Sequence, residues 1–244
     1  LTAVTIESFP MDSFHFILAV FEFVVLVFSL SLHEAAHAWV ANRLGDPTAR
    51  MLGRVTLNPI KHVDLIGTII IPLFMIFMPG YGRFLIGWAK PTPVTPRNFR
   101  NTTRDDILTT LAGPCSNILA AMVATIALIV LSKASATGAD IVHRLAAGAP
   151  LDSVMAASPT LLPLALLFYM GITLNVILFI FNLIPLPPLD GSHVIRHMLP
   201  YNVLRVYDSL GLVSLLLFIF LGYKIIAIFA GPLLGFIDGI LLSL

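Results

Sequence analysis

Four long apolar stretches dominate the pattern of hydrophobic and polar positions along this chain. Each is near the roughly 20 residues that a helix needs to cross a bilayer, and they cover about residues 14–41, 106–132, 160–182 and 209–230. A shorter apolar run at 66–78 contains Pro72 and is typical of a re-entrant segment. The apolar tail 225–244 predicts one further helix. The pattern predicts an all-α, multi-pass membrane protein that forms a single embedded domain over 1–244.

Composition supports this fold class and excludes several functions. Of 244 residues, 58% are hydrophobic and only 11% are charged, whereas soluble domains carry roughly 25% charged residues. A net charge of +1, with no basic stripe, gives no indication of nucleic-acid binding. Cys115 is the single cysteine, which excludes an internal disulfide and a cysteine-based metal site.

The positions of lysine and arginine predict the orientation in the membrane. None precedes the first apolar stretch, and nine lie between that stretch and residue 105. Cytosolic loops carry an excess of basic residues, so we expect the N-terminus outside and the connections 43–105 and 183–208 in the cytosol. The nine are Arg43, Arg50, Arg54, Lys61, Arg83, Lys90, Arg97, Arg100 and Arg104.

The end of the first apolar stretch contains the sequence His33-Glu34-Ala35-Ala36-His37. Residues four apart lie on one face of a helix, so the two histidines can bind one metal ion together. Glu34 lies one step around the helix, where its carboxylate can take a proton from a water on that metal. The motif indicates hydrolytic metal chemistry, and its apolar surroundings place the metal at membrane depth, in the cytosolic half of the bilayer.

A catalytic zinc usually has three protein ligands, and the sequence limits the third. The only glutamates are Glu7, Glu22 and Glu34, so no glutamate follows the motif. A histidine six residues after the second is also excluded, because Arg43 occupies that position. The remaining candidates are Asp46, Asp64, Asp190, His62, His193 and His197.

Asp190 is the preferred third ligand because of the residues before it. Pro185, Pro187 and Pro188 stand where a membrane helix should continue, and each removes a donor and breaks the helix. Irregular backbone at membrane depth is tolerated only where it faces protein or a wet cavity, which aims Asp190 at an interior site. The alternative is that the prolines end the helix and Asp190 caps the next element.

Together, these motifs resemble the site-2 protease family of intramembrane zinc metalloproteases, in a short form without PDZ or CBS domains. The resemblance is carried by HEAAH at 33–37, Gly113-Pro114-Cys115-Ser116-Asn117, and NLIPLPPLDG at 182–191, in the order of the family. It implies a core of three helices that carry the HExxH, GxxxN and N-P-D-G motifs. It also implies regulated proteolysis of membrane-tethered substrates that contain transmembrane helices.

The resemblance assigns roles to individual residues. It implies that His33, His37 and Asp190 hold one Zn²⁺ per chain and that Glu34 is the catalytic base. Asn182 and Asn117 would be polar helpers near the metal, where an amide can stabilise an oxyanion. His62, Asp64, His193 and His197 are candidates for lining a water channel, or else ordinary polar residues of loops and interfaces.

The segment Gly87-Trp88-Ala89-Lys90-Pro91-Thr92-Pro93-Val94 also resembles one in short members of the family. Alternate residues of a strand point their donors to one edge, and prolines lack the donor. One edge therefore keeps pairing groups at Lys90, Thr92 and Val94, and we hypothesise that it clamps an unwound substrate by strand addition. The alternative is an ordinary proline-rich surface loop.

Two other functions compete with the protease. Some zinc transporters carry a similar His-Glu pair, but a transport path needs polar ligands on several helices, and stretches 106–132 and 160–182 contain no histidine or acid beyond Asp106. The second is an inactive metal-binding relative, against which the intact Glu34 argues.

Overall fold

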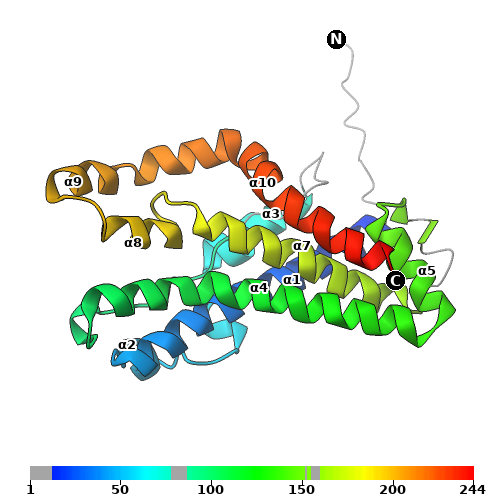
Figure 1. The fold of residues 1–244 in the computed structure, drawn as a ribbon, viewed down its shortest axis with the longest axis horizontal. Helices are drawn as coiled ribbons and strands as arrows, with labels where there is room; N and C mark the ends of the chain where they lie inside the picture. Colours follow the sequence, from blue (N-terminus) through cyan, green and yellow to red (C-terminus); the bar gives the residue numbers. More distant parts are fainter. Residues whose placement is uncertain (1–12, 78–86, 152, 155–159) are drawn as a thin grey trace, which may run out of the picture.

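The computed structural model describes residues 13–77, 87–151, 153–154 and 160–244 (Figure 1). All regular structure in these ranges is helical, which confirms the all-α class. Three helices are long and apolar enough to cross a membrane, namely α1 (Ser13–Leu44), α4 (Thr102–Ala134) and α7 (Leu162–Leu183). The chain is therefore an integral membrane protein.

These three helices pack against one another, and α4 also contacts α5 (Ala136–Ala146) (Figure 1). Leu128 of α4, Ile141 of α5 and Val176 of α7 are fully buried in the larger apolar core. A smaller core joins Leu26 of α1 to Leu174 of α7. Large apolar side chains on the outer faces remain exposed, as expected for helices in contact with lipid.

The C-terminal part differs from the expected pair of helices. Segments 209–230 and 225–244 are not separate, because α10 (Gly211–Leu242) runs through both as one helix with Pro232 inside it. Membrane helices tolerate proline, since their neighbours satisfy the freed backbone groups. Near the end of α10, Asp238 accepts a hydrogen bond of 3.1 Å from the Tyr169 hydroxyl of α7.

The connection after α1 is mostly short helices. It contains α2 (Thr48–Met51), the 3-10 helix η1 (Pro59–Lys61), the π-helix η2 (Leu65–Ile70) and α3 (Ile71–Phe77). The expected re-entrant segment 66–78 is thus helical up to residue 77, and residues 78–86 lie outside the described part. The Trp88 N–H donates to the Gly67 carbonyl at 3.2 Å, so the chain returns beside its starting point.

A segment without helix or strand, residues 87–95, follows and leads into η3 (Pro96–Asn98). Asp46, which lies after the end of α1 and is fully buried, ties down the far end of this segment. Its carboxylate accepts hydrogen bonds from the Thr95 N–H at 2.7 Å, the Asn98 amide at 2.8 Å and Thr48. Burial alone would raise the pKa of Asp46, but these hydrogen bonds outweigh burial and hold it below its usual value.

Two short helices, α8 (Asp190–Arg196) and α9 (Tyr201–Ser209), connect α7 to α10. Helix α7 ends at Leu183, and Ile184 is extended, the conformation favoured before a proline. The prolines therefore end α7, and the irregular residues 184–189 lead directly to Asp190.

Candidate metal centre

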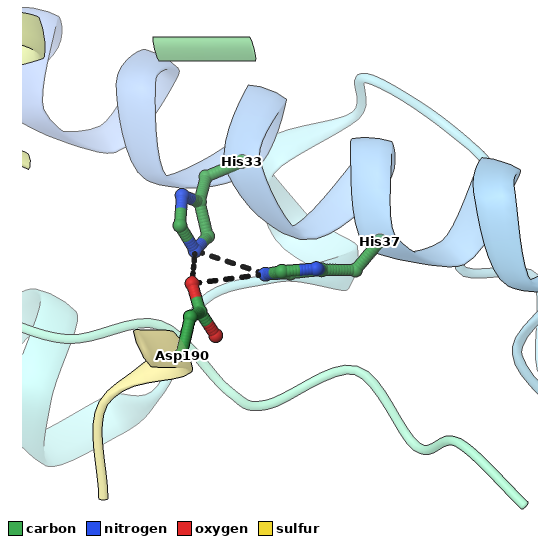
Figure 2. Close-up of side chains that lie close together, drawn as sticks. All are labelled: His33, His37 and Asp190. Carbon is green, nitrogen blue, oxygen red and sulfur yellow. Dashed lines mark hydrogen bonds and ion pairs between the residues drawn. The ribbon is translucent and has the colours of Figure 1, made fainter. Parts of the chain in front are cut away.

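Three side chains from two distant parts of the sequence converge at one point. Figure 2 shows His33 and His37 projecting from α1 toward Asp190, the first residue of α8. The Asp190 Oδ2 atom lies 3.0 Å from His33 Nε2 and 3.4 Å from His37 Nε2. The two Nε2 atoms are 3.0 Å apart. Both histidines are buried, at 5% and 6% exposure.

The contacts of the two Nδ1 atoms determine which nitrogen of each imidazole is available to a metal. His37 Nδ1 lies 2.7 Å from the Thr109 carbonyl, and His33 Nδ1 lies 2.6 Å from Asn117 Oδ1. Both partners are acceptors, so each Nδ1 carries the proton and each Nε2 presents a lone pair to the centre.

The donor set fits a metal cation. Asp190 Oδ2 is buried without a hydrogen-bond donor, and it faces two Nε2 lone pairs. Among the residues that the structure describes, this is the one group of three or more histidine, cysteine, aspartate or glutamate side chains close enough to share an ion. Ligands on a tetrahedral zinc about 2.0 Å away would lie about 3.3 Å from one another, close to the 3.0–3.4 Å observed. A cation would remove the repulsion among the three lone pairs.

A network of buried polar side chains orients Asn117. Its Nδ2 donates to Asn175 Oδ1 of α7 at 2.9 Å, so its oxygen faces His33. The Asn175 amide in turn donates to the Ser29 hydroxyl of α1 at 2.9 Å. All three side chains are buried. The network links the three membrane helices and fixes the tautomer of His33, as is usual for metal-binding histidines.

Gly113 allows α4 to approach the two histidines. A Cβ atom built at this position would lie within 2.6 Å of His33 Nε2 and closer still to His37 Nε2. Such contacts are far shorter than van der Waals separation, so only glycine fits here. Pro114 follows within α4, and it has no N–H to donate to the Thr110 carbonyl, one residue after the Thr109 carbonyl that accepts from His37.

Glu34 is held by a different part of the chain. Its Oε2 accepts the Thr92 N–H at 2.7 Å, and the Thr92 hydroxyl donates to the Glu34 carbonyl at 2.9 Å. The carboxylate is close enough to His37 for an electrostatic interaction. Glu34 is thus adjacent to the candidate metal site, and segment 87–95 holds it in place.

Comparison with known proteins identifies the family of this chain. Residues 21–220 match the model of peptidase family M50, the site-2 protease family. The chain belongs to this family. A Bacillus subtilis protein named "Putative zinc metalloprotease YwhC" is 38% identical over 180 residues, which cover 74% of this chain and 69% of the relative. This M50 chain is therefore a metalloendopeptidase.

Two further relatives carry the name "Putative zinc metalloprotease Rip2". The one from Mycobacterium tuberculosis (strain H37Rv) is 30% identical over 173 residues, which cover 70% of this chain and 55% of the relative. The one from Mycolicibacterium smegmatis is 34% identical over 94 residues, 38% of this chain and 34% of the relative. No solved structure matches the chain.

Other predicted residues of the M50 chain have local partners. The Asn182 amide donates to the Leu178 carbonyl of its own helix at 3.0 Å. Asn117 serves His33, as described above. The backbone donors of the proposed clamp at Lys90 and Thr92 are already used, by the His62 carbonyl at 2.8 Å and by Glu34. A substrate strand on this edge would have to exchange those bonds.

The candidate channel residues fall into two groups. His62 is buried and its Nε2 lies 2.8 Å from the Thr56 carbonyl, and Asp64 caps the start of η2. His193 and His197 instead line an open cavity of about 240 Å³ together with Asp106. The first two residues have local structural partners, and the last two border a space that water can enter.

Several site residues have no obvious signal in the sequence. The Thr109 carbonyl is a backbone group, so its residue type says nothing about its role. Ser29 and Asn175 each share a helix with other polar residues, such as Ser31 and Thr173, so their residue type alone does not mark them as supports of the site. The spacing of 109, 113 and 117 offers one signal, because residues four apart share a helix face.

Proposed function

We propose that this peptidase cleaves peptide bonds within transmembrane segments, at a zinc ion held by His33, His37 and Asp190. The observation that supports the proposal is the convergence of three potential ligand atoms between α1 and α8. His37 lies seven residues before the end of α1 at Leu44, about 10 Å along the helix axis. The site is therefore below the end of a membrane helix, where a transmembrane substrate is accessible.

The residues of the chain divide the chemistry among them. A bound Zn²⁺ would supply a Lewis acid that acidifies water and polarises the peptide carbonyl. Glu34 takes the proton of the attacking water and returns it to the leaving nitrogen. Asn182 has a second amide N–H beyond the one bonded to Leu178, and we propose that it stabilises the developing oxyanion.

The proposed side of cleavage is the cytosol. The excess of lysine and arginine in 43–105 supports a cytosolic location for the loops around Asp46 and Lys90. Both motifs that contribute to the site lie beside these connections. Water and the unwound substrate would then enter from the cytosolic face.

We also propose that the edge with Lys90, Thr92 and Val94 clamps the unwound substrate. The Thr92 donor already serves Glu34, so Thr92→Pro would impair the base as well as a clamp. Val94→Pro removes the next donor on the same edge and leaves the Glu34 bond. We expect a higher KM with unchanged zinc affinity; an unchanged KM would remove the clamp from the proposal.

Glu34→Ala tests the function directly. The purified chain, reconstituted in liposomes with a single-pass membrane substrate, should lose cleavage and retain zinc. A general base is worth roughly 10²–10⁴-fold in rate. Zinc flux into the liposomes in both the parent and the variant, with cleavage in neither, would instead indicate a transporter.

A further inference from the structure

Helix α8 carries Asp190 at one end and two further histidines toward the other. His193 and His197, the residue that caps the C-terminal end of α8, are four residues apart and lie on one side of it. Both face the carboxylate of Asp106 on α4, whose Oδ2 lies 2.7 Å from His197 Nε2 and 3.7 Å from His193 Nδ1. Asp106 is buried, at 7% exposure, and no part of the proposed chemistry uses it.

Helix α4 contacts the metal-binding elements at two points, and these points are equally far apart in the two partners. Gly113 of α4 lies against the histidine nitrogens that meet Asp190. Asp106 precedes Gly113 by seven residues, and His197 follows Asp190 by seven. Seven residues advance a helix by about 10 Å, so α8 runs back along the first half of α4 with matched spacing (Figure 1).

The direction of α8 depends on contacts at its two ends, one of which is the ion pair of Arg196 with Asp208 of α9 at 2.9 Å. Helix α8 has seven residues, and a helix that short is not stable by itself. Its N-terminal end packs closely on the end of α7, where a Cβ at Gly191 would lie within 2.7 Å of the Ile184 carbonyl. At the C-terminal end of α8, His193 and His197 contact the Asp106 carboxylate of α4.

We infer that Asp106 is a positioning residue for the metal ligand Asp190, acting through His197 and His193. With its N-terminal end fixed on α7 and its C-terminal end bonded to α4, α8 has one orientation, and that orientation aims Asp190 at the two histidines. Helix α4 then positions all three ligands, through Asn117, Thr109 and Asp106. This inference rests on the proposed zinc site.

A pair of neighbouring carboxylates provides a matched test. Asp105 is as buried as Asp106 and lies on the same helix, but its Oδ2 accepts from the Asn101 N–H of the α4 N-terminus at 2.9 Å. Zinc affinity of the purified full chain is measured by competition with a chelator, and Co²⁺ substitution reports the ligand geometry by its visible spectrum. We expect Asp106→Asn to weaken zinc binding by roughly 10–100-fold and to alter the Co²⁺ spectrum, with Asp105→Asn within about threefold of the parent.

A double-variant cycle tests the route through His197. His197→Gln should weaken zinc binding. The double variant with Asp106→Asn should bind zinc no more weakly than Asp106→Asn alone, because both changes remove the contact between Asp106 and His197. His197 is partly exposed, so this variant tests the inference even where Asp106→Asn does not fold.

The outcomes separate the inference from the proposed function. Parent-like zinc affinity in a folded Asp106→Asn or His197→Gln chain overturns the inference, and so does equal weakening by Asp105→Asn. Asp190→Ala serves as the reference: if it too binds zinc like the parent, the proposed zinc site itself is wrong.

Discussion

The two halves of the proposed catalytic machinery are held in different ways. The proposed metal-binding half rests on membrane helices, where His33 contacts the buried Asn117 side chain and His37 contacts the Thr109 carbonyl of α4. The proposed base rests on a backbone group of segment 87–95, because Glu34 accepts from the Thr92 N–H. Neighbouring residues on one turn of α1 thus depend on separate supports.

The difference follows from what each group must do. Metal ligands have to keep a fixed geometry, and interlocked helices with buried amide networks provide it. A general base must meet both the water and the leaving nitrogen, and a hydrogen bond to a backbone N–H orients it without filling the site. Damage to the first support should therefore reduce zinc binding, and damage to the second should reduce catalysis and not zinc binding.

The largest effect is expected for Gly113→Ala. The added methyl group would overlap the ligand nitrogens of both histidines, so zinc affinity should fall by about 100-fold or more, and cleavage with it. Gly171→Ala on α7 is the matched control, because its Cβ would lie 3.7 Å from the Ala124 Cβ, an ordinary contact. Parent-like zinc binding by the Gly113 variant would contradict the close approach of α4.

Asn117→Ala comes next. It removes the acceptor of His33 Nδ1 and leaves Asn175 without its buried partner, so zinc affinity should fall by roughly 10–100-fold. Isothermal titration with zinc measures the change. If cleavage fell while zinc affinity stayed constant, Asn117 would serve the reaction directly and not the ligand.

Thr92→Pro should have a smaller effect, on catalysis and not on zinc binding. Proline lacks the N–H that orients Glu34, and a hydrogen bond to a charged group is worth about 1.5–3 kcal/mol, so kcat should fall by roughly 10–100-fold with zinc affinity unchanged. Thr92→Val keeps the N–H and removes only the hydroxyl, so its kcat should stay near the parent value. Loss of zinc in the proline variant would show that the two supports are coupled.

Asp46→Asn should affect stability more than activity. The pKa of Asp46 is lowered in the folded chain, so its stabilising effect is present above the unfolded pKa of about 3.9 and is lost as the pH falls through the folded value. We expect the variant to melt below the parent at pH 7 and the two melting temperatures to converge on acidification. A constant difference from pH 7 to pH 3 would contradict the role of the carboxylate charge.

The sequence predicts the candidate metal ligands better than it predicts the groups that hold them in place. His33 and His37 follow from helical spacing, and Asp190 follows from the scarcity of acids and from the prolines before it. The Thr109 carbonyl could not be predicted, since every residue has one. Likewise, the occupied donors at Lys90 and Thr92 depend on how the chain returns beside Gly67 and His62, which no local pattern encodes.

The fold shows the same division. Long apolar runs predict α1, α4 and α7, because a bilayer demands about 20 apolar residues. The continuity of α10 is harder to predict, since Gly231-Pro232 would end a helix in a soluble protein but is tolerated within a membrane helix. Tertiary neighbours decide that case, and a single sequence does not contain them.

X-ray absorption at the zinc edge tests the central claim most directly, on the purified parent and on Asp190→Ala. We predict one zinc per parent chain with two imidazole nitrogens and oxygen ligands at about 2.0–2.2 Å, and weaker binding with one carboxylate oxygen fewer in the variant. An identical ligand shell and affinity in both proteins would contradict a zinc site shared by α1 and α8.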